Sequence, residues 1–261
     1  MSVTDVLVLQ FLKTYGVPVL SILGLIVLIT NNISLIRNKF LSRLVSKFDS
    51  ASETLLVDYK KELFKPLYSI VSTDWKLRNK GLIRILEIGL RTGENVKYYP
   101  KNSHLLVVDR NVYIKTYLKS KPHLTSCINV ENVTVSSGDN LRHIPDNSID
   151  AVVGTFVLCS ASRMDDLLHE IKRVLAPGGL YFYIEHTAEP NNTFHYKLQS
   201  FLTVTKLWPS IFDGCHLNRI PEKSIKGACF SDVTFQYVTL ASNENVFSKF
   251  MKTYLIGIAA N

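Results

Sequence analysis

The most constraining feature of this chain is a glycine-bearing turn between two short apolar runs. The first run is Leu82-Ile-Arg-Ile-Leu-Glu-Ile88, the turn holds Gly89 and Gly93, and the second run ends at Asp109. With the helix-like segment between them, these runs predict a βαβ unit that binds a nucleotide. In such a unit the backbone N–H groups of the turn approach the ligand, and an acid that ends the second strand accepts hydrogen bonds from ribose hydroxyls.

The rest of the chain continues to alternate between strand-like and helix-like segments. Further strands are predicted over Asn132–Ser136, Ile149–Phe156, Leu180–Ile184, Val233–Leu240 and Thr253–Ala259, and helices over Val112–Lys119 and Met164–Leu175, the second of them ended by Pro177-Gly178-Gly179. The continuous apolar run at 149–156 is typical of a central parallel strand that is covered on both faces. This order predicts an α/β domain with a largely parallel sheet, into which the last apolar run is inserted as a strand.

An uncharged and largely apolar stretch, Thr14–Ile36, precedes this domain. Its twenty-three residues, at about 1.5 Å each, would cross a hydrocarbon core of about 30 Å, although the apolar centre is also short enough for a hairpin or an interfacial helix. The positive residues Arg37, Lys39, Arg43 and Lys47 follow the stretch, whereas a signal peptide carries its positive cluster before the apolar run. This order disfavours a cleavable signal peptide and predicts a retained membrane anchor over residues 1–36, with the remainder on the cytosolic side.

The basic surplus of the chain lies directly after this stretch. The formal net charge is +8, and Arg37–Lys101 alone contributes +7, from 14 Lys and Arg against 7 Asp and Glu. No aromatic-interleaved basic patch accompanies it, so the anionic cytosolic leaflet of a membrane is favoured over nucleic acid as a partner. We interpret residues 37–81 as a basic juxtamembrane and helical segment. The helix predicted over Glu53–Ser72 would either pack on the sheet or form a wall of the active site.

Two further features concern the substrate and the cysteines. The stretch Pro190–Cys215 breaks the alternation and is rich in aromatic residues, so we interpret residues 187–216 as a substrate lid.

The cysteines show neither a Cys-x-x-Cys pair nor a metal-like spacing with histidines, and they are interpreted as reduced thiols without a metal site. The four of them are Cys127, Cys159, Cys215 and Cys229.

Five motifs, in this order, resemble those of the class I S-adenosylmethionine-dependent methyltransferases. They are Glu87-Ile-Gly-x-x-Thr-Gly93, Asp109, Ser137-Gly-Asp139, Ser148-Ile-Asp-Ala-Val-Val153 and Arg173-Val-Leu-Ala-Pro-Gly-Gly179. Within that superfamily the chain is similar to the methyltransferase-like protein 7 family of membrane-anchored thiol S-methyltransferases. This second resemblance lies in the N-terminal anchor, Lys60-Lys-Glu-Leu-Phe64, Val157-Leu-Cys-Ser160, Glu185-His186 and Phe212-Asp-Gly-Cys215.

The resemblance implies a Rossmann-like methyltransferase domain over residues 82–261, with a seven-stranded, mostly parallel sheet whose last strand is antiparallel. It implies S-adenosylmethionine as the cofactor and methyl transfer to a small lipophilic acceptor, most readily a thiol. It also implies a location at the endoplasmic reticulum membrane or a lipid droplet, with the catalytic domain facing the cytosol.

The resemblance also assigns cofactor-binding roles to individual residues. Glu87, Gly89 and Gly93 would frame the methionine part of the cofactor, and Asp109 would take the ribose hydroxyls. The pair Asp139-Asn140 would flank the adenine. The chain departs from the family at Arg91, which stands in place of a glycine. Its side chain would either crowd the loop or hold the cofactor's carboxylate.

Methyl transfer to a thiol needs a thiolate, so some group has to accept the proton of the thiol. We expect His186, at the end of the fifth strand, to be this base, with Asp213 orienting it or lining the pocket. Cys215 as a nucleophile is a less favoured interpretation, since an Asp-Gly-Cys turn is as easily structural.

Three alternatives compete with a thiol methyltransferase. Methylation of a lipid or a quinone ring would use the same cofactor site with a different pocket. A catalytically silent membrane or lipid-droplet protein would keep the fold, and Arg91 is its warning sign. The opening βαβ unit alone also suits a nicotinamide dehydrogenase, but the Ser137-Gly-Asp139 turn and the Arg173–Gly179 ending favour the methyltransferase.

Overall fold

The computed structural model describes residues 53–240 apart from 102 and 127, residues 250–261 and residue 21. The chain divides into two units after Lys47, and apart from residue 21 the described residues belong to the second unit, Phe48–Asn261. The predicted anchor over residues 1–36 therefore lies outside the described residues, save for residue 21. Within the described part, none of the helices combines the length and the apolar character that a membrane span requires.

The domain is built on one sheet of seven strands in the order β3-β2-β1-β4-β5-β7-β6. The strands are β1 Arg84–Ile88, β2 His104–Asp109, β3 Asn129–Val135, β4 Ile149–Thr155, β5 Leu175–His186, β6 Asp232–Thr239 and β7 Thr253–Ala260. The first five strands pair in parallel, whereas β7 is antiparallel to both of its neighbours, β5 and β6. The predictions of a mostly parallel sheet and of an inserted, antiparallel last strand are confirmed.

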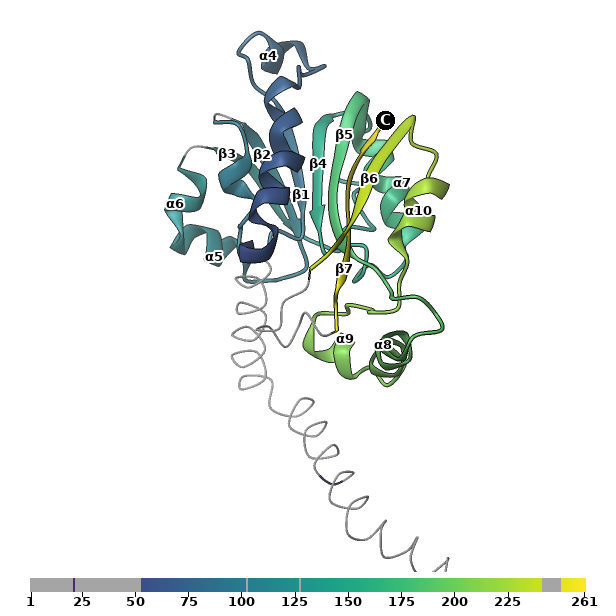
Figure 1. Cartoon of the computed structure of the whole chain (residues 1–261). Coiled ribbons are helices and arrows are strands. Elements are labelled where there is room, and N and C mark those ends of the chain that lie inside the picture. Colours follow the sequence, from purple (N-terminus) through teal and green to yellow (C-terminus); the bar gives the residue numbers. More distant parts are fainter. Residues whose placement is uncertain (1–20, 22–52, 102, 127, 241–249) are drawn as a thin grey trace, which may run out of the picture. The chain divides into compact units, whose positions relative to one another are not determined.

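Short helices connect the strands. They are an α-helix over residues 53–64, η2 Lys65–Ser69, α4 Trp75–Arg78, η3 Val96–Tyr98, α5 Ile114–Ser120, α6 Pro122–Thr125, α7 Met164–Val174, α8 Phe194–Val204, α9 Leu207–Ile211 and α10 Pro221–Gly227. Figure 1 shows the helix over residues 53–64 lying in front of the sheet, across β1.

Successive residues of β5 divide the core between the two faces of the sheet, because side chains alternate along a strand. The ring of Phe182 lies 6.0 Å from that of Phe64, at the end of the helix over residues 53–64. Tyr181 and Tyr183 point to the other face, where they share one buried cluster with the apolar stripe of α7. Between these layers β4 is buried at every position, as predicted for a central strand.

Two predicted helices differ from the structure because of local backbone chemistry. The segment between Gly93 and β2 forms only the single turn η3, since its ten residues also include Pro100. The helix predicted over Glu53–Ser72 is α-helical only as far as residue 64 and continues as η2. Pro66 lies in the first turn of η2, and a proline has no N–H to continue the α-helical ladder.

The turn Pro177-Gly178-Gly179 also plays a different part from the predicted one. Helix α7 ends at Val174, and the turn lies inside β5, where the pairing with β4 shifts register between Ile149 and Ala151. Gly178 has φ +75°, a left-handed conformation that favours glycine. The turn is therefore a bulge at the start of β5.

The parallel strands bring their carboxyl ends to one edge of the sheet. The strand order reverses between β1 and β4, and ligands of such sheets bind at this switch point. Figure 1 shows α8 and α9 beyond the same edge, below β5 and β7. The fold thus places the turn after β1 and the predicted lid on the same side of the domain.

Candidate active site

A cleft opens at the switch point, between the carboxyl ends of β1 and β4. It encloses about 340 Å³ of empty space, which includes the part open to solvent. The turn after β1 contributes Gly89, Arg91 and Asn95, and the end of β4 contributes Thr155 and Phe156. The helix over residues 53–64 supplies the remaining wall, so it both packs on the sheet and lines the cleft.

Glu87 is the buried acid next to this cleft. Its side chain projects from β1, and its Oε1 accepts a hydrogen bond of 2.9 Å from Nδ2 of Asn95, which also donates to Thr155 at 3.1 Å. Its Oε2 and Oδ1 of Asn95 are buried and have no hydrogen-bond partner among the described residues. Burial raises the pKa of Glu87 to about 7, and the hydrogen bond from Asn95 limits this rise. Two neighbouring buried acceptors without a donor suit a cationic ligand group.

The turn after β1 adopts a left-handed backbone at three positions. Gly89 has φ +72° and Gly93 has φ +75°, and a Cβ at either would come within 3.2 Å of a neighbouring side chain. Arg91 has φ +53°, so the arginine follows the left-handed course that suits a glycine better. Its backbone N–H donates to Oδ2 of Asp109 at 3.0 Å. The loop therefore keeps its course despite the arginine.

Asp109 connects two loops at the end of β2. Its Oδ2 accepts the Arg91 N–H, and its Oδ1 accepts the N–H of Asn111 at 2.8 Å. The residue is buried. Each carboxylate oxygen has a second lone pair, so the same side chain retains capacity for the hydroxyls of a ribose.

Asp139 and Asn140 lie in the turn after β3. The N–H of Ser136 donates to the carbonyl of Asp109 at 3.0 Å, which joins this turn to the end of β2. A hydrogen bond from Ser137 holds the pKa of the Asp139 carboxyl below its usual range, so this acid is ionised at neutral pH. Asp139 is half-buried and Asn140 is exposed. The ends of β1, β2 and β3 thus bring together all the residues predicted to bind the cofactor.

Gly138, in the same turn, packs directly on β1. A Cβ at this position would lie 2.6 Å from Cγ2 of Ile88 and 3.0 Å from Cδ1 of Leu167, both buried. We expect Gly138→Ala to lower the free energy of unfolding by about 1–3 kcal/mol, because the added methyl group overpacks the core. Urea unfolding followed by circular dichroism measures this change. Gly227→Ala is the matched control, since a Cβ there meets nothing within 4 Å; equal losses in both variants would contradict the packing argument.

The helix was predicted as a possible wall of the active site, but the ion pair on it was not predicted from the sequence. Lys60 and Glu53 form a buried ion pair, and Oε1 of Glu53 also lies 2.9 Å from Nζ of Lys97 and 2.7 Å from the hydroxyl of Tyr98. Although burial opposes it, the hydrogen bonds from Lys60 and Lys97 hold the pKa of Glu53 below its usual range. The seven-residue spacing places Glu53 and Lys60 on one helix face, which is the only sequence signal for the pair.

A second cluster of polar side chains lies at the ends of β4 and β5. Glu185 is buried, and its carboxylate accepts the N–H groups of Val157 at 2.7 Å, Leu158 at 2.8 Å and Cys159 at 3.2 Å. It thereby fixes the loop after β4. Burial raises the pKa of Glu185 to about 8, and the hydrogen bonds from the loop oppose this rise.

His186, the predicted base, is fully buried beside this loop. Its Nε2 lies 3.0 Å from Sγ of Cys215, and its Nδ1 has no partner among the described residues. Cys159 completes the group, because the sulfur and nitrogen atoms of Cys159, His186 and Cys215 all lie within 4.8 Å of one another. The interpretation of the cysteines from their spacing missed this group, which sequence distance concealed.

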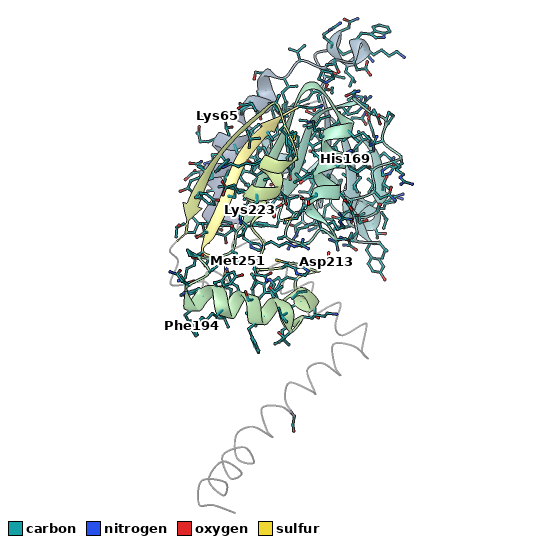
Figure 2. All side chains as sticks on the ribbon, turned by 90° about the vertical axis from the view of Figure 1, so that its right-hand side faces the viewer. Lys65, His169, Phe194, Asp213, Lys223 and Met251 are labelled. Carbon is teal, nitrogen blue, oxygen red and sulfur yellow. The ribbon has the colours of Figure 1, made fainter. Side chains whose placement is uncertain are left out.

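Asp213, the other predicted catalytic residue, lies in the turn after α9. It has φ +48° and an exposed side chain, and Figure 2 shows it between α8 and the rest of the domain. Among the described contacts none joins it to His186. The predicted lid contains α8 and α9, and the rings of Trp208 and Phe212 stack there at 4.2 Å between centroids. A role for Asp213 in the pocket stays a prediction.

S-adenosylmethionine fits the groups at the cleft. Its ammonium would meet Oε2 of Glu87 and Oδ1 of Asn95, the two buried acceptors without a donor. Its ribose would meet Asp109, and its adenine the turn with Asp139 and Asn140. When bound, this cofactor supplies a methyl group on a sulfonium that is already a good leaving group.

Comparisons with known proteins agree with this geometry. Residues 86–183 match the family model described as a methyltransferase domain. The human protein thiol S-methyltransferase TMT1A is 34% identical over 179 residues, which cover 69% of this chain and 70% of that protein. The mouse protein thiol S-methyltransferase TMT1B is 36% identical over 178 residues, covering 68% and 70%.

A solved structure supports the fold alone. The S-adenosylmethionine-dependent methyltransferase of Thermotoga maritima superposes with a TM-score of 0.52 at 13% identity, covering 84% of this chain and 96% of that one.

Proposed function

The chain belongs to the family of the thiol S-methyltransferases TMT1A and TMT1B, and we propose that it transfers the methyl group of S-adenosylmethionine to a small lipophilic thiol. The observation that carries this proposal is the pair of buried acceptors on Glu87 and Asn95, near Asp109, the residue predicted to take the ribose hydroxyls. These three acceptor groups at one sheet edge suit a ligand that carries both an ammonium and a ribose.

The acceptor site is proposed to lie at the ends of β4 and β5, under the lid. Phe156 lines the cofactor cleft, and its ring lies edge-on to that of Tyr254 at 6.0 Å. Trp208 also lies 5.4 Å from Phe250 between ring centroids. Aromatic walls of this kind favour a lipophilic acceptor and exclude water. A dry site suits the reaction because a thiolate and a sulfonium cancel their charges in the transition state.

The thiol has to lose its proton before it attacks. His186 is the group predicted to receive it. The loop after β4 connects the two places along the chain, since it runs from Phe156 at the cleft to Cys159 beside His186. The proton acceptor is accordingly proposed to lie within the group of Cys159, His186 and Cys215.

Calorimetric titration of the full chain with S-adenosylmethionine tests the cofactor part of the proposal. One binding event per chain is expected, and no measurable heat with folded protein would exclude an enzyme and favour the silent alternative. Turnover assays that compare alkyl thiols with quinol precursors and lipids test the acceptor. Methylation confined to the quinols or the lipids would overturn the thiol assignment while leaving the cofactor site intact.

A membrane location is proposed on the sequence alone. Thr14–Ile36 is long enough to anchor the chain, and the positive residues that follow favour a catalytic domain on the cytosolic face of the endoplasmic reticulum or of a lipid droplet. We expect protease added to sealed microsomes to digest the domain completely. Protection of the domain until detergent is added would contradict this orientation.

Arg91 offers a test of the loop itself. Its backbone already follows the course of a glycine, so the side chain at the cleft is the part that a substitution changes. We expect Arg91→Gly to raise the dissociation constant of S-adenosylmethionine about 3- to 10-fold, because a partly exposed charge pair with the methionine carboxylate would be lost. Calorimetry measures the change. Tighter binding would instead show that the arginine crowds the loop.

A further inference from the structure

We propose that Cys159, His186 and Cys215 bind a zinc ion and that this ion receives the thiol acceptor as its fourth ligand. The part of the proposal that concerns the acceptor rests on the proposed function, whereas the metal site stands on geometry. All three side chains are buried, and the three ligand atoms lie within 4.8 Å of one another.

The spacing of these atoms is compatible with a tetrahedral zinc site. Zinc binds sulfur at about 2.3 Å and nitrogen at about 2.0–2.1 Å, which separates the ligand atoms by about 3.5–3.8 Å. Nε2 of His186 lies 3.0 Å from Sγ of Cys215. A side-chain rotation that moves these two atoms apart by a fraction of an ångström brings the pair to the required distance. Two sulfurs and one imidazole nitrogen also form a ligand set that catalytic zinc sites use, with one position left for a substrate.

The fold holds the three ligands from separate segments. Cys159 lies in the loop after β4, His186 ends β5, and Cys215 follows α9. Glu185 fixes the Cys159 loop through the N–H groups of three successive residues. Arg219 fixes it from the other side, since its Nη1 donates to the carbonyls of Leu158 at 2.7 Å, Cys159 at 3.0 Å and Ala161 at 2.7 Å. Metal centres typically have ligands whose backbone is fixed by hydrogen bonds from neighbouring side chains, as Glu185 and Arg219 fix this loop.

The ligand set balances the charge of a divalent cation, because the two thiolates neutralise the ion. A buried site that keeps no net charge avoids the penalty of an uncompensated ion.

The position of the site explains what the metal would do. Phe156 lines the cofactor cleft, and Cys159 lies three residues further along the same loop. A thiol that binds zinc gives up its proton to solvent and becomes a thiolate at neutral pH. Its sulfur then forms a bond to the methyl carbon, while the bond between that carbon and the sulfonium sulfur breaks and leaves its electron pair on the departing thioether. His186 would act here as a ligand, in place of the predicted base.

Cobalt provides the test, because it replaces zinc in such sites and its spectrum reports the ligands. The full chain is purified in detergent with a non-thiol reductant, and its zinc content is measured before titration with Co²⁺. We expect one equivalent per chain, with a thiolate-to-cobalt charge-transfer band and the visible bands of a tetrahedral site. Adding an alkyl thiol should shift the visible bands.

Single substitutions locate the site. Cys159→Ala and Cys215→Ala should each weaken cobalt binding by about 100-fold or more, since each removes one of three ligands. Cys229→Ala is the matched control, because this free cysteine is exposed and belongs to no cluster of described ligands. Calorimetry with S-adenosylmethionine verifies that each variant is folded, since the cofactor cleft uses none of these residues.

Several outcomes would overturn the proposal. Failure of the reduced native chain to bind cobalt stoichiometrically would remove the metal site, and so would a Cys159–Cys215 disulfide that persists under the reductant. A cobalt spectrum unmoved by thiols would remove the acceptor role. Undiminished thiol methylation by metal-free protein would do the same and favour His186 as a base. Cobalt binding without any thiol methylation would instead refute the proposed function and leave the metal site standing.

Discussion

Glu87→Gln is expected to raise the dissociation constant of S-adenosylmethionine about 100-fold while it stabilises the ligand-free protein. The native carboxylate offers its Oε2 to the cofactor's ammonium from a fully buried position, close to the hydroxyl of Tyr99. A charge-assisted hydrogen bond in such a site contributes about 1.5–3 kcal/mol, and about 1.4 kcal/mol corresponds to a tenfold change in affinity.

The expected gain in stability of the Glu87→Gln variant arises because the native carboxylate is costly to bury when no ligand is bound. Burial raises the pKa of Glu87 to about 7 from the usual value of 4.5, so the folded protein holds this proton more tightly than the unfolded chain. Between pH 4.5 and about pH 7 the folded protein binds more protons than the unfolded chain. The free energy of unfolding therefore falls as the pH rises through this range. Above pH 7 the carboxylate is charged, and in the absence of ligand Asn95, Tyr99 and Lys60 offset the cost of its burial only in part. We expect the glutamine variant to be about 1–2 kcal/mol more stable at pH 8, since a neutral amide is easier to bury.

The same titration predicts how cofactor binding depends on pH. Below about pH 7 the carboxyl has to release a proton before it meets the ammonium, so the affinity should fall by up to about tenfold per unit. Above about pH 8 the cofactor's own amine loses its proton, and the affinity should fall again. Calorimetry from pH 5.5 to 9 should therefore give a maximum between about pH 7 and 8.

Two results would contradict this role for Glu87. The first is a glutamine variant that keeps the acidic limb of the pH profile, because that limb is assigned to the Glu87 carboxyl. The second is an affinity within about threefold of the native value. Glu62→Gln is the control, since this glutamate pairs with Lys65 on an exposed surface and should change neither affinity nor stability by more than a few tenths of a kcal/mol.

Asp109→Ala should also weaken cofactor binding about 100-fold, but with a loss of stability. The substitution removes the acceptor for the ribose hydroxyls, and it leaves the N–H groups of Arg91 and Asn111 without their partner. Both bonds are partly buried, so we expect the free energy of unfolding to fall by about 1–3 kcal/mol in total. The turn after β1 should become more mobile as a result, because the Arg91 N–H anchors it to β2.

Asp139→Ala provides the graded comparison for Asp109. It should raise the dissociation constant only about 3- to 10-fold, since one half-buried contact to the adenine is lost and no loop is released. Calorimetry at a fixed pH of 7.5 and thermal unfolding measure both effects. Similar losses in the two variants would contradict the assignment of Asp109 as the residue that joins the ribose site to the loop.

Much of the fold could be predicted because its signals are local. The strands followed from apolar runs of strand length, and the insertion of Thr253–Ala260 between β5 and β6 agrees with its apolar character, which suits a strand covered on both sides. The errors also have local causes. Pro66 ends the α-helix that periodicity extended to residue 72, and Gly178 admits a bulge where a helix end was expected.

The cofactor site was predictable for the same reason. Glu87, Gly89, Gly93 and Asp109 lie within one βαβ unit, where the order of the chain fixes their order in space. A parallel sheet brings strand ends to one edge, so the turn with Asp139 follows from the strand pattern as well.

By itself, then, the sequence determined the strands, the glycine-bearing turn after β1 and the acid at the end of β2, because each depends on residues close together in the chain. Only the tertiary structure decided that Lys60 and Glu53 line the cleft and that Cys159, His186 and Cys215 converge. The cysteines of that group are 56 residues apart, and they meet because β5 pairs with β4 and the α8–α9 segment returns over the strand ends. Contacts of this kind depend on how the whole chain folds, so they cannot be predicted from the spacing of residues in the sequence.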